Sequence, residues 1–230
     1  NILIKIGAAV ECIHAYSLIH DDLPCMDDDK LRRGKLTTHK KFGESTAILA
    51  GNSLLTIGFE ILSSKNLNIK TNLKIKLINL ISECVGHTGV AGGQFLDLSY
   101  ERKKISLDKT IKMQRKKTGM LFQFCCVTPS ILANKKKYNI KFRNIGSDIG
   151  LLFQITDDLI DYRGKTKNAG KKTGKDIKKG KATLISLLGY KNTINYSNKL
   201  KQNIFARLDK FGKNANELKK TINYVINRNK

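Results

Sequence analysis

Two groups of aspartates in this sequence have the types and spacing of metal ligands. In the first group, five aspartates fall within nine residues of a chain whose net charge is +24. Two carboxylates about 4 Å apart repel each other by roughly 4 kcal/mol at an effective dielectric constant near 20. Such a cluster is costly unless cations lie among its oxygens. The first group therefore indicates a metal site, and its members are Asp21, Asp22, Asp27, Asp28 and Asp29.

A second acidic group consists of Asp157, Asp158 and Asp161. Positions i, i+1 and i+4 lie on one side of an α-helix, because each residue turns the chain by about 100°. The two groups hold eight of the 19 acidic residues, whereas solvated acids would be scattered more evenly. Aspartate oxygens without His or Cys partners suit Mg²⁺, which is commonly shared with substrate phosphates. We therefore expect Mg²⁺ ions that hold a diphosphate.

Basic residues accompany both acidic groups. Arg32 and Arg33 follow the first group, Lys171 and Lys181 follow the second, and Lys117 lies between them. Arg offers bidentate donors to phosphate and Lys a compact charge, so both can neutralise a leaving group. The implied reaction is the departure of a diphosphate.

The elements that must position these residues are predicted to be almost all helical, because prolines are few and strand-like alternation is scarce. An apolar helical pattern leads from Leu3 into the first acidic group, where Pro24 should end the helix and leave Asp27 on a bend. His14 lies seven residues before Asp21 and so on almost the same face.

Later segments also have helical spacing. Residues 45–62 are apolar almost all round, which predicts a central, buried helix. Ser106 has the position of a helix N-cap. Residues 144–162 form the helix of the second acidic group, with apolar residues on one side. Residues 163–183 are rich in Gly and Lys and predict a mobile loop, and residues 184–230 predict two or three amphipathic helices.

Composition limits the class of protein. The chain of 230 residues is long enough for one large domain, and no linker divides it. It contains no run of 18 or more apolar residues, which predicts the absence of a membrane span. Five cysteines without a Cys-x-x-Cys pair argue against disulfides and zinc and indicate reduced thiols in the cytoplasm. Abundant Lys is accompanied by Asn and Ile throughout, so we interpret it as compositional drift and expect no nucleic-acid partner.

At its motifs the chain resembles the trans-isoprenyl diphosphate synthase family, and most closely the bacterial farnesyl diphosphate synthases. Both aspartate-rich motifs of that family are present in order, together with the intervening motifs at the family spacing. The matching pieces are Asp21-Asp22-Leu23-Pro24-Cys25-Met26-Asp27, Arg32-Arg33-Gly34, Gly92-Gly93-Gln94, Lys117-Thr118-Gly119, Phe153-Gln154, Asp157-Asp158-Leu159-Ile160-Asp161 and Gly180-Lys181-Ala182-Thr183.

The resemblance implies an all-α fold: a single-domain helical bundle of the isoprenoid (terpenoid) synthase type with a central cavity. Residues 1–230 would form one polyprenyl synthase domain. The family's Gly-Lys-x-x-Arg motif, which binds isopentenyl diphosphate, has no match in this sequence. We therefore expect that the N-terminal helices of the domain precede Asn1.

The resemblance also implies site roles. Condensation of isopentenyl diphosphate with an allylic diphosphate would use three Mg²⁺ ions per site, and no protein nucleophile is needed. The catalytic residues would be Asp21, Asp22, Asp157, Lys117 and Arg32, and the metal ligands would be Asp21, Asp22, Asp27, Asp157, Asp158 and Asp161. The substrate-binding residues would be His14, Arg32, Arg33, Lys117, Thr118, Gln154, Lys171 and Lys181.

Tyr16 and Ser17 lie about one helical turn before Asp21. In the family a bulky residue there resembles a floor that stops elongation, which predicts the C15 product, farnesyl diphosphate. Helix geometry places Ser17 on the face of Asp21 better than Tyr16. A homodimer is typical of the family. The alternatives are a geranyl or geranylgeranyl diphosphate synthase, a class I terpene cyclase, a non-catalytic synthase subunit, and a basic nucleic-acid-binding module.

Overall fold

The computed structural model describes residues 2–167 and 182–228, with the side chains of 164–167 left out. The described residues are almost entirely helical, as the sequence predicts. Contacts between residues divide the chain into two compact units, Asn1–Leu80 and Ile81–Lys230. Each unit is described by itself.

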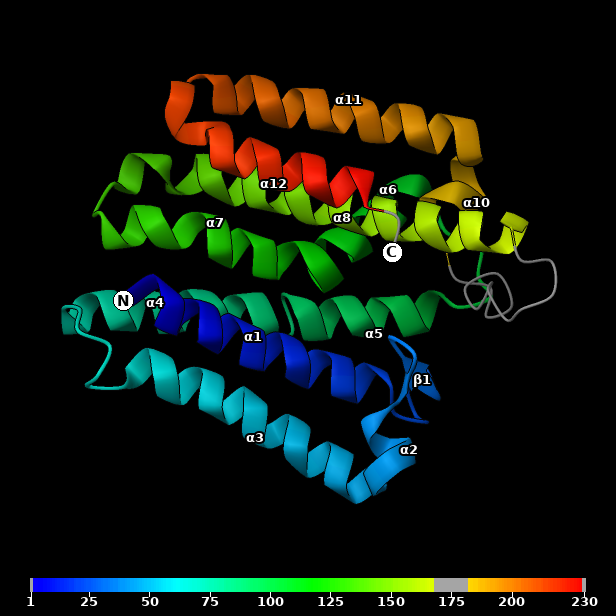
Figure 1. The fold of residues 1–230 in the computed structure, drawn as a ribbon, viewed down its shortest axis with the longest axis horizontal. Coiled ribbons are helices and arrows are strands. Elements are labelled where there is room, and N and C mark those ends of the chain that lie inside the picture. The colour runs from blue at the N-terminus through cyan, green and yellow to red at the C-terminus, as the bar shows by residue number, and fades with distance from the viewer. Residues whose placement is uncertain (1, 168–181, 229–230) are drawn as a thin grey trace. The chain divides into compact units, whose positions relative to one another are not determined.

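The first unit contains two long helices that pack against each other (Figure 1). A Cβ atom on Gly51 would lie 2.2 Å from Nε2 of His20, and one on Gly58 would lie 2.6 Å from Cγ1 of Ile13. Because residue numbers fall along one helix as they rise along the other, the two helices are antiparallel. The elements of this unit are α1 (Ile2–Asp21), β1 (Leu31–Arg32), β2 (Lys35–Leu36), α2 (Thr38–Phe42), α3 (Glu44–Ser63) and the first part of α4 (Thr71–Val85).

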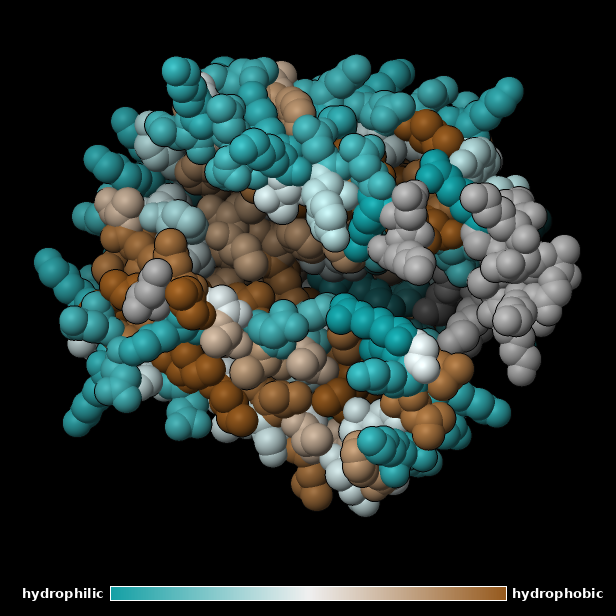
Figure 2. Space-filling model, viewed as in Figure 1, coloured by the Kyte–Doolittle hydropathy of each residue, from teal (hydrophilic) through white to brown (hydrophobic). Residues whose placement is uncertain are grey.

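Residues 45–62 form a helix, as predicted, but the prediction that this helix is buried is wrong. The helix forms as α3, but it buries only a narrow stripe of residues. The side chains of Ile48, Leu49 and Ile57 are 42%, 66% and 39% exposed. Figure 2 shows apolar residues gathered over α1 and α3. By length and composition alone these two helices could cross a membrane, which is weak evidence because helices of soluble proteins meet the same criterion.

The second unit is built around the long helix α8 (Figure 1). The apolar face predicted for residues 144–162 is confirmed, because Ile145, Ile149, Leu152 and Ile155 are all buried in the main core cluster. The predicted cap is also confirmed, since Ser106 Oγ accepts a hydrogen bond from the amide of Lys109. The elements after α4 are α5 (Val90–Tyr100), α6 (Leu107–Gln114), η1 (Arg115–Gly119), α7 (Met120–Leu132), η2 (Lys136–Tyr138), α8 (Asn139–Lys167), α10 (Leu184–Leu188), α11 (Tyr190–Asp209), η3 (Gly212–Ala215) and α12 (Asn216–Asn227).

The segment η1 is a turn of π-helix, a form that is rare and often found at functional sites. Its backbone is approached closely from two sides by glycines. A Cβ atom on Gly93 of α5 would lie 2.2 Å from the amide nitrogen of Lys117, and one on Gly150 of α8 would lie 2.4 Å from Cα of Gly119. Small residues therefore fix the position of the turn that carries Lys117 and Thr118.

Candidate active site

The first acidic group lies where α1 ends. The helix stops at Asp21, three residues before Pro24, as the sequence predicts. The chain then folds back: the amide of Asp27 donates to the carbonyl of Asp21 at 2.8 Å, and the amide of Asp29 donates to the carbonyl of Asp22 at 3.2 Å. In an unbroken helix Asp28 would share the face of Asp21, so this loop is what brings Asp27 beside Asp21.

Asp22 is held by an arginine. Its side chain is 3% exposed, and its two carboxylate oxygens accept hydrogen bonds from Nε and Nη2 of Arg32 at 2.8 and 2.7 Å. The hydrogen bond to Asp22 raises the pKa of Arg32. Bidentate pairs of this kind fix geometry as well as charge. Asp22 stays a predicted metal ligand, and the structure adds that it anchors Arg32.

A β-hairpin positions the paired arginines. Arg32 on β1 pairs with Lys35 on β2, which leaves Arg33 and Gly34 as a two-residue turn. Both turn residues have positive φ angles, 51° and 79°, as a type I′ turn requires. Gly adopts this conformation freely, but in Arg it is strained by about 1–2 kcal/mol. Strain of this kind is often found where a side chain has a function.

We predict that Arg33→Asn separates stability from activity. Asn tolerates a positive φ angle better than Arg does, so thermal unfolding should occur at the same or a slightly higher temperature. The loss of the guanidinium should raise the KM for isopentenyl diphosphate by about tenfold or more, because a charged hydrogen bond is worth about 1.5–3 kcal/mol. Calorimetry and steady-state kinetics measure the two effects. A lower melting temperature with an unchanged KM would make Arg33 structural.

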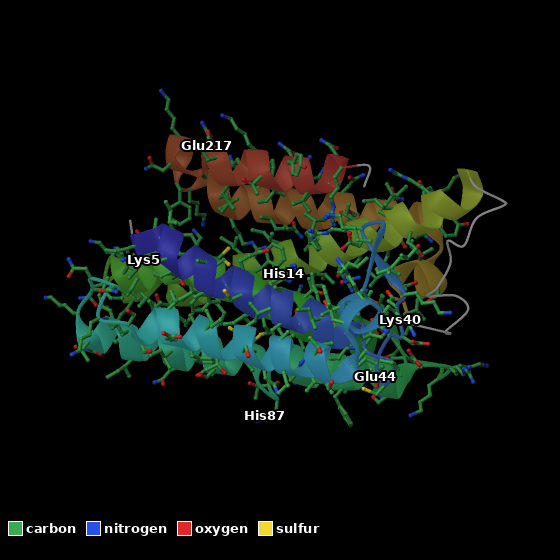
Figure 3. The ribbon with its side chains drawn as sticks, turned by 60° about the horizontal axis from the view of Figure 1, so that its bottom comes forward. Lys5, His14, Lys40, Glu44, His87 and Glu217 are labelled. Atoms are coloured by element: carbon green, nitrogen blue, oxygen red, sulfur yellow. The ribbon has the colours of Figure 1, made fainter. Side chains whose placement is uncertain are left out.

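His14, Tyr16 and Ser17 lie on α1 before the first acidic group, and Figure 3 labels His14 there. Burial lowers the pKa of His14, and the charges of Arg32 and Arg33 lower it further against the opposing effect of Glu11. His14 is therefore neutral at pH 7 and can serve as a hydrogen-bonding group.

The two residues predicted to set product length have different surroundings. The Tyr16 ring packs edge-on against His20 with centroids 4.8 Å apart. Burial raises the pKa of Tyr16, and the charge of Asp21 raises it further. Ser17 Oγ donates to the carbonyl of His14 at 2.8 Å, so its hydroxyl is bound to its own helix.

In the second unit, hydrogen bonds connect the π-helical turn to the second acidic group. Lys117 Nζ donates to Asp97 Oδ2 at 2.7 Å. Thr118 Oγ1 donates to Gln154 Oε1 at 2.9 Å, and Gln154 Nε2 donates to Asp158 Oδ1 at 3.1 Å. Four of the predicted site residues therefore lie together, and three of them, Lys117, Gln154 and Asp158, line a cavity of about 70 Å³.

The carboxylate of Asp158 is buried and hydrogen-bonded on both oxygens. Its exposed fraction is 6%, and Gln114 Nε2 donates to its second oxygen at 3.1 Å. Gln114 was not predicted as a site residue, because an isolated glutamine on a helix does not indicate any particular chemistry. The Oε1 atom of Gln114 and both polar side-chain atoms of Gln94 are buried without a partner among the described residues. Such atoms are costly to bury.

Asp157 is the more accessible carboxylate of the pair, with 43% of its side chain exposed. Burial raises its pKa, and the charge of Arg228 lowers it. Arg228 Nη2 donates to Asp157 Oδ1 at 2.5 Å, and its guanidinium lies 3.9 Å from the centroid of the Phe153 ring. Asp157 thus already contacts a cation, which fits the ionised carboxylate that a metal ligand must be.

The sequence reading also missed Arg228, which is 71 residues from Asp157. The signal available was the residue type, an arginine in a tail otherwise rich in Asn and Lys. Lys171 and Lys181 lie outside the described residues, as does most of the predicted loop; residues 163–167 of that loop are helical. Asp161 is half-buried on α8. The expected cavity shared by the two acidic groups stays a prediction.

The donor set suits Mg²⁺, although no ready-made metal site exists among the described residues. There, no three His, Cys, Asp or Glu side chains lie together as a possible metal centre. Mg²⁺ commonly takes one or two carboxylates and fills its other positions with waters and substrate phosphates. A pair of carboxylates in each acidic group is therefore sufficient on the protein side.

Comparisons with known proteins agree with these features. The family model described as polyprenyl synthetase matches residues 1–225. A farnesyl diphosphate synthase of Micrococcus luteus is 42% identical over 97% of this chain and 77% of its own length. A geranylgeranyl diphosphate synthase of Cyanophora paradoxa is 37% identical over 97% of this chain and 75% of its own length. A geranyltransferase of Helicobacter pylori, crystallised with magnesium and isoprenyl diphosphate, has a TM-score of 0.84 and 33% identity over 97% of this chain and 73% of its own.

Proposed function

Because this chain belongs to the polyprenyl synthetase family, we propose that it is a prenyltransferase that joins isopentenyl diphosphate to an allylic diphosphate. The observation that carries this proposal is the pair of hydrogen-bonded sets at the π-helical turn, in which Lys117 is bound to Asp97, and Thr118 is connected through Gln154 to Asp158. These contacts place the ammonium of Lys117 and the carboxylates of Asp97 and Asp158 beside one cavity. A cation and carboxylates are the groups needed to receive a diphosphate and its counterions.

The reaction begins with the allylic C–O bond, which breaks to give an allylic cation and free diphosphate. Mg²⁺, with three ions per site, would supply positive charge to the departing diphosphate. We propose Asp21, Asp27 and Asp157 as the principal ligands, with Asp22, Asp158 and Asp161 as direct or water-mediated supports. Asp158 is well placed to support, because Gln114 and Gln154 already occupy both of its oxygens.

The remaining residues bind and orient the two substrates. Lys117 and Arg32 would contact the allylic diphosphate, with Lys171 and Lys181 adding further positive charge. His14 and Arg33 would bind isopentenyl diphosphate, whose double bond attacks the cation. The released diphosphate then takes the proton that the product loses, so the protein needs no base of its own. In this division, neutral His14 contributes a hydrogen bond and Arg33 contributes the charge.

Product analysis tests the function directly. The protein is incubated with Mg²⁺, isopentenyl diphosphate and geranyl diphosphate, and the prenyl products are sized after dephosphorylation. The expected product is farnesol. No new product with either dimethylallyl or geranyl diphosphate would overturn the proposal. Products formed without isopentenyl diphosphate would instead indicate a cyclase.

We propose the C15 product because the more similar of the two compared relatives is a farnesyl diphosphate synthase. We predict that Tyr16→Ala shifts the product toward longer chains, since removing the ring opens space one turn before Asp21. The fraction of products longer than C15 should rise at least about threefold, an energetic change of only about 0.6 kcal/mol. Tyr16→Phe is the matched control, because it keeps the ring that packs against His20 and removes only the hydroxyl. An unchanged product length for Tyr16→Ala would remove Tyr16 from this role.

We also propose that the protein is a cytoplasmic homodimer. The exposed apolar side chains of α3 support an interface, because patches of this kind on a folded protein usually mark a contact surface. Five free cysteines fit a reducing compartment. Analytical ultracentrifugation should give a dimer for the native sequence and a monomer for Leu49→Asp.

A further inference from the structure

Three arginines of the second unit line one cavity away from both acidic groups. They are Arg115 of η1, Arg143 of α8 and Arg207 of α11. The chain has 35 lysines but only eight arginines, so its cationic positions are overwhelmingly lysine. Where arginine remains in such a chain, the planar guanidinium with its five donors is the property that lysine cannot replace. Three of the eight arginines line this one cavity, which indicates that the guanidinium groups have a role there.

A half-buried carboxylate aligns two of these guanidinium groups. Asp148 is 13% exposed at its side chain and accepts from Nη2 of Arg115 at 2.5 Å and from Nη2 of Arg207. Arg115 Nη1 also donates to Ser147 Oγ at 2.8 Å. About one third of each arginine side chain, 33% and 31%, remains exposed. The pair is therefore rigidly held yet keeps donors available to a ligand.

Arg143 completes the cavity with a weaker attachment. Its Nη1 lies 3.6 Å from Glu83 Oε2, and 42% of its side chain is exposed. The cavity has a volume of about 360 Å³, at the lower end of the range for small-molecule sites. Three guanidinium groups and one carboxylate give its lining a net charge of +2, and Gln123 and Asn144 add amide donors. A ligand with two or more negative charges fits this lining.

A second cavity adjoins the first and shares Arg115, Gln123 and Ser147 with it. Its volume is about 380 Å³, and its lining includes Ile111 and Met120 together with Lys112 and Lys116. Long lysine side chains present apolar stems beneath their charged ends. The two cavities together therefore offer a charged compartment continuous with a more apolar one.

We propose that this arginine cavity is a second binding site for a diphosphate group, carried either by free diphosphate or by a prenyl diphosphate. The site is separate from the second acidic group. Asp148 and Asp157 are nine residues apart on α8, which is about two and a half turns, so they lie on opposite faces and roughly 13 Å apart along the axis. Arg115 lies two residues before Lys117 in the same π-helical turn. The choice of diphosphate as ligand rests on the proposed function, whereas the basic cavity does not.

Calorimetric titration of the whole chain in EDTA, at physiological salt, tests the proposal. Without Mg²⁺ the aspartate groups repel a diphosphate, so binding at the arginines is measured apart from turnover. Inorganic diphosphate should bind the native sequence, and Arg143→Gln should weaken that binding about tenfold, the effect of losing one charged hydrogen bond. Arg102→Gln is the matched control for charge, since this exposed arginine lies outside the cavity. It should change the affinity by less than about twofold.

Farnesyl diphosphate identifies the natural source of the group. If it binds more tightly than inorganic diphosphate, and Met120→Gln removes only that excess, then the ligand is a prenyl diphosphate. If both bind equally, the ligand is free diphosphate. Equal affinities for the native sequence, Arg143→Gln and Arg102→Gln would overturn the proposal and leave the arginines as structural partners of Asp148. A failure of the transferase assay would leave this result untouched.

Discussion

Replacing Asp157 by asparagine is expected to lower kcat by about 10³-fold while the fold persists. The substitution keeps the shape of the side chain and removes its charge. Of the two adjacent carboxylates of the second acidic group, Asp157 is the more exposed one. It contacts the cation Arg228 rather than glutamines, so its carboxylate is the better placed of the two to bind an ion. Loss of one electrostatic group at a reacting centre commonly costs 10²–10³-fold. Steady-state rates with geranyl and isopentenyl diphosphate at saturating Mg²⁺ measure the change.

The fold should tolerate Asp157→Asn because two effects oppose each other. Burial raises the pKa of this carboxyl, so removing the charge relieves an unfavourable desolvation. The same change weakens the contact with Arg228. Asp209→Asn is the control, since Asp209 pairs with Lys219 on the surface and is 64% exposed; it should leave kcat unchanged. Retention of more than about a tenth of the native kcat by Asp157→Asn would exclude Asp157 as a principal ligand.

The parts of this structure that the sequence predicts are those decided by local chemistry. Pro24 removes a backbone donor and restricts the residue before it, so α1 must end nearby. Ser106 caps the helix that follows it. The apolar face of α8 follows from a spacing of three and four residues. The same spacing does not predict that Asp158 is buried while Asp161 is half-buried.

The burial of α3 could not be predicted in the same way. A helix that is apolar all round is usually buried on every side, but periodicity cannot tell whether the second surface belongs to the same chain. Here only the stripe with Gly51 and Gly58 is covered within the first unit. The apolar residues outside that stripe therefore give the same periodic signal as core residues, although they are exposed.

The site residues that were missed depend on long-range contacts. Arg228 meets Asp157 across 71 residues, and Gln114 meets Asp158 across 44. Neither contact leaves a spacing pattern in the sequence. The hairpin was missed for another reason, since its two strands have two residues each and its turn places Arg, an unusual residue, at a positive φ angle.

Gly93→Ala is expected to disrupt both stability and catalysis, because the added methyl group meets backbone that cannot move independently. The new Cβ would lie 2.2 Å from the amide nitrogen of Lys117 and 2.5 Å from its Cα. Overpacking of this kind typically costs about 1–3 kcal/mol. The displaced π-helical turn would also shift the ammonium of Lys117, and a misplacement of about 1 Å can cost about 10²-fold in rate. Urea unfolding and kcat/KM measure the two effects.

Gly7→Ala is the control for Gly93→Ala, because it adds the same methyl group at a helical glycine that approaches no other backbone. Gly7 lies inside α1, and a Cβ atom built there would have no neighbour within 4 Å. In a helix interior Ala is favoured over Gly by about 0.5–1 kcal/mol, so this variant should unfold at a higher urea concentration and keep its rate. If Gly93→Ala were stabilised to the same extent, α5 would not press against the turn. Gly93 would then be an ordinary helical glycine, and the position of Lys117 would depend on its ion pair with Asp97 and on the approach of Gly150 to Gly119.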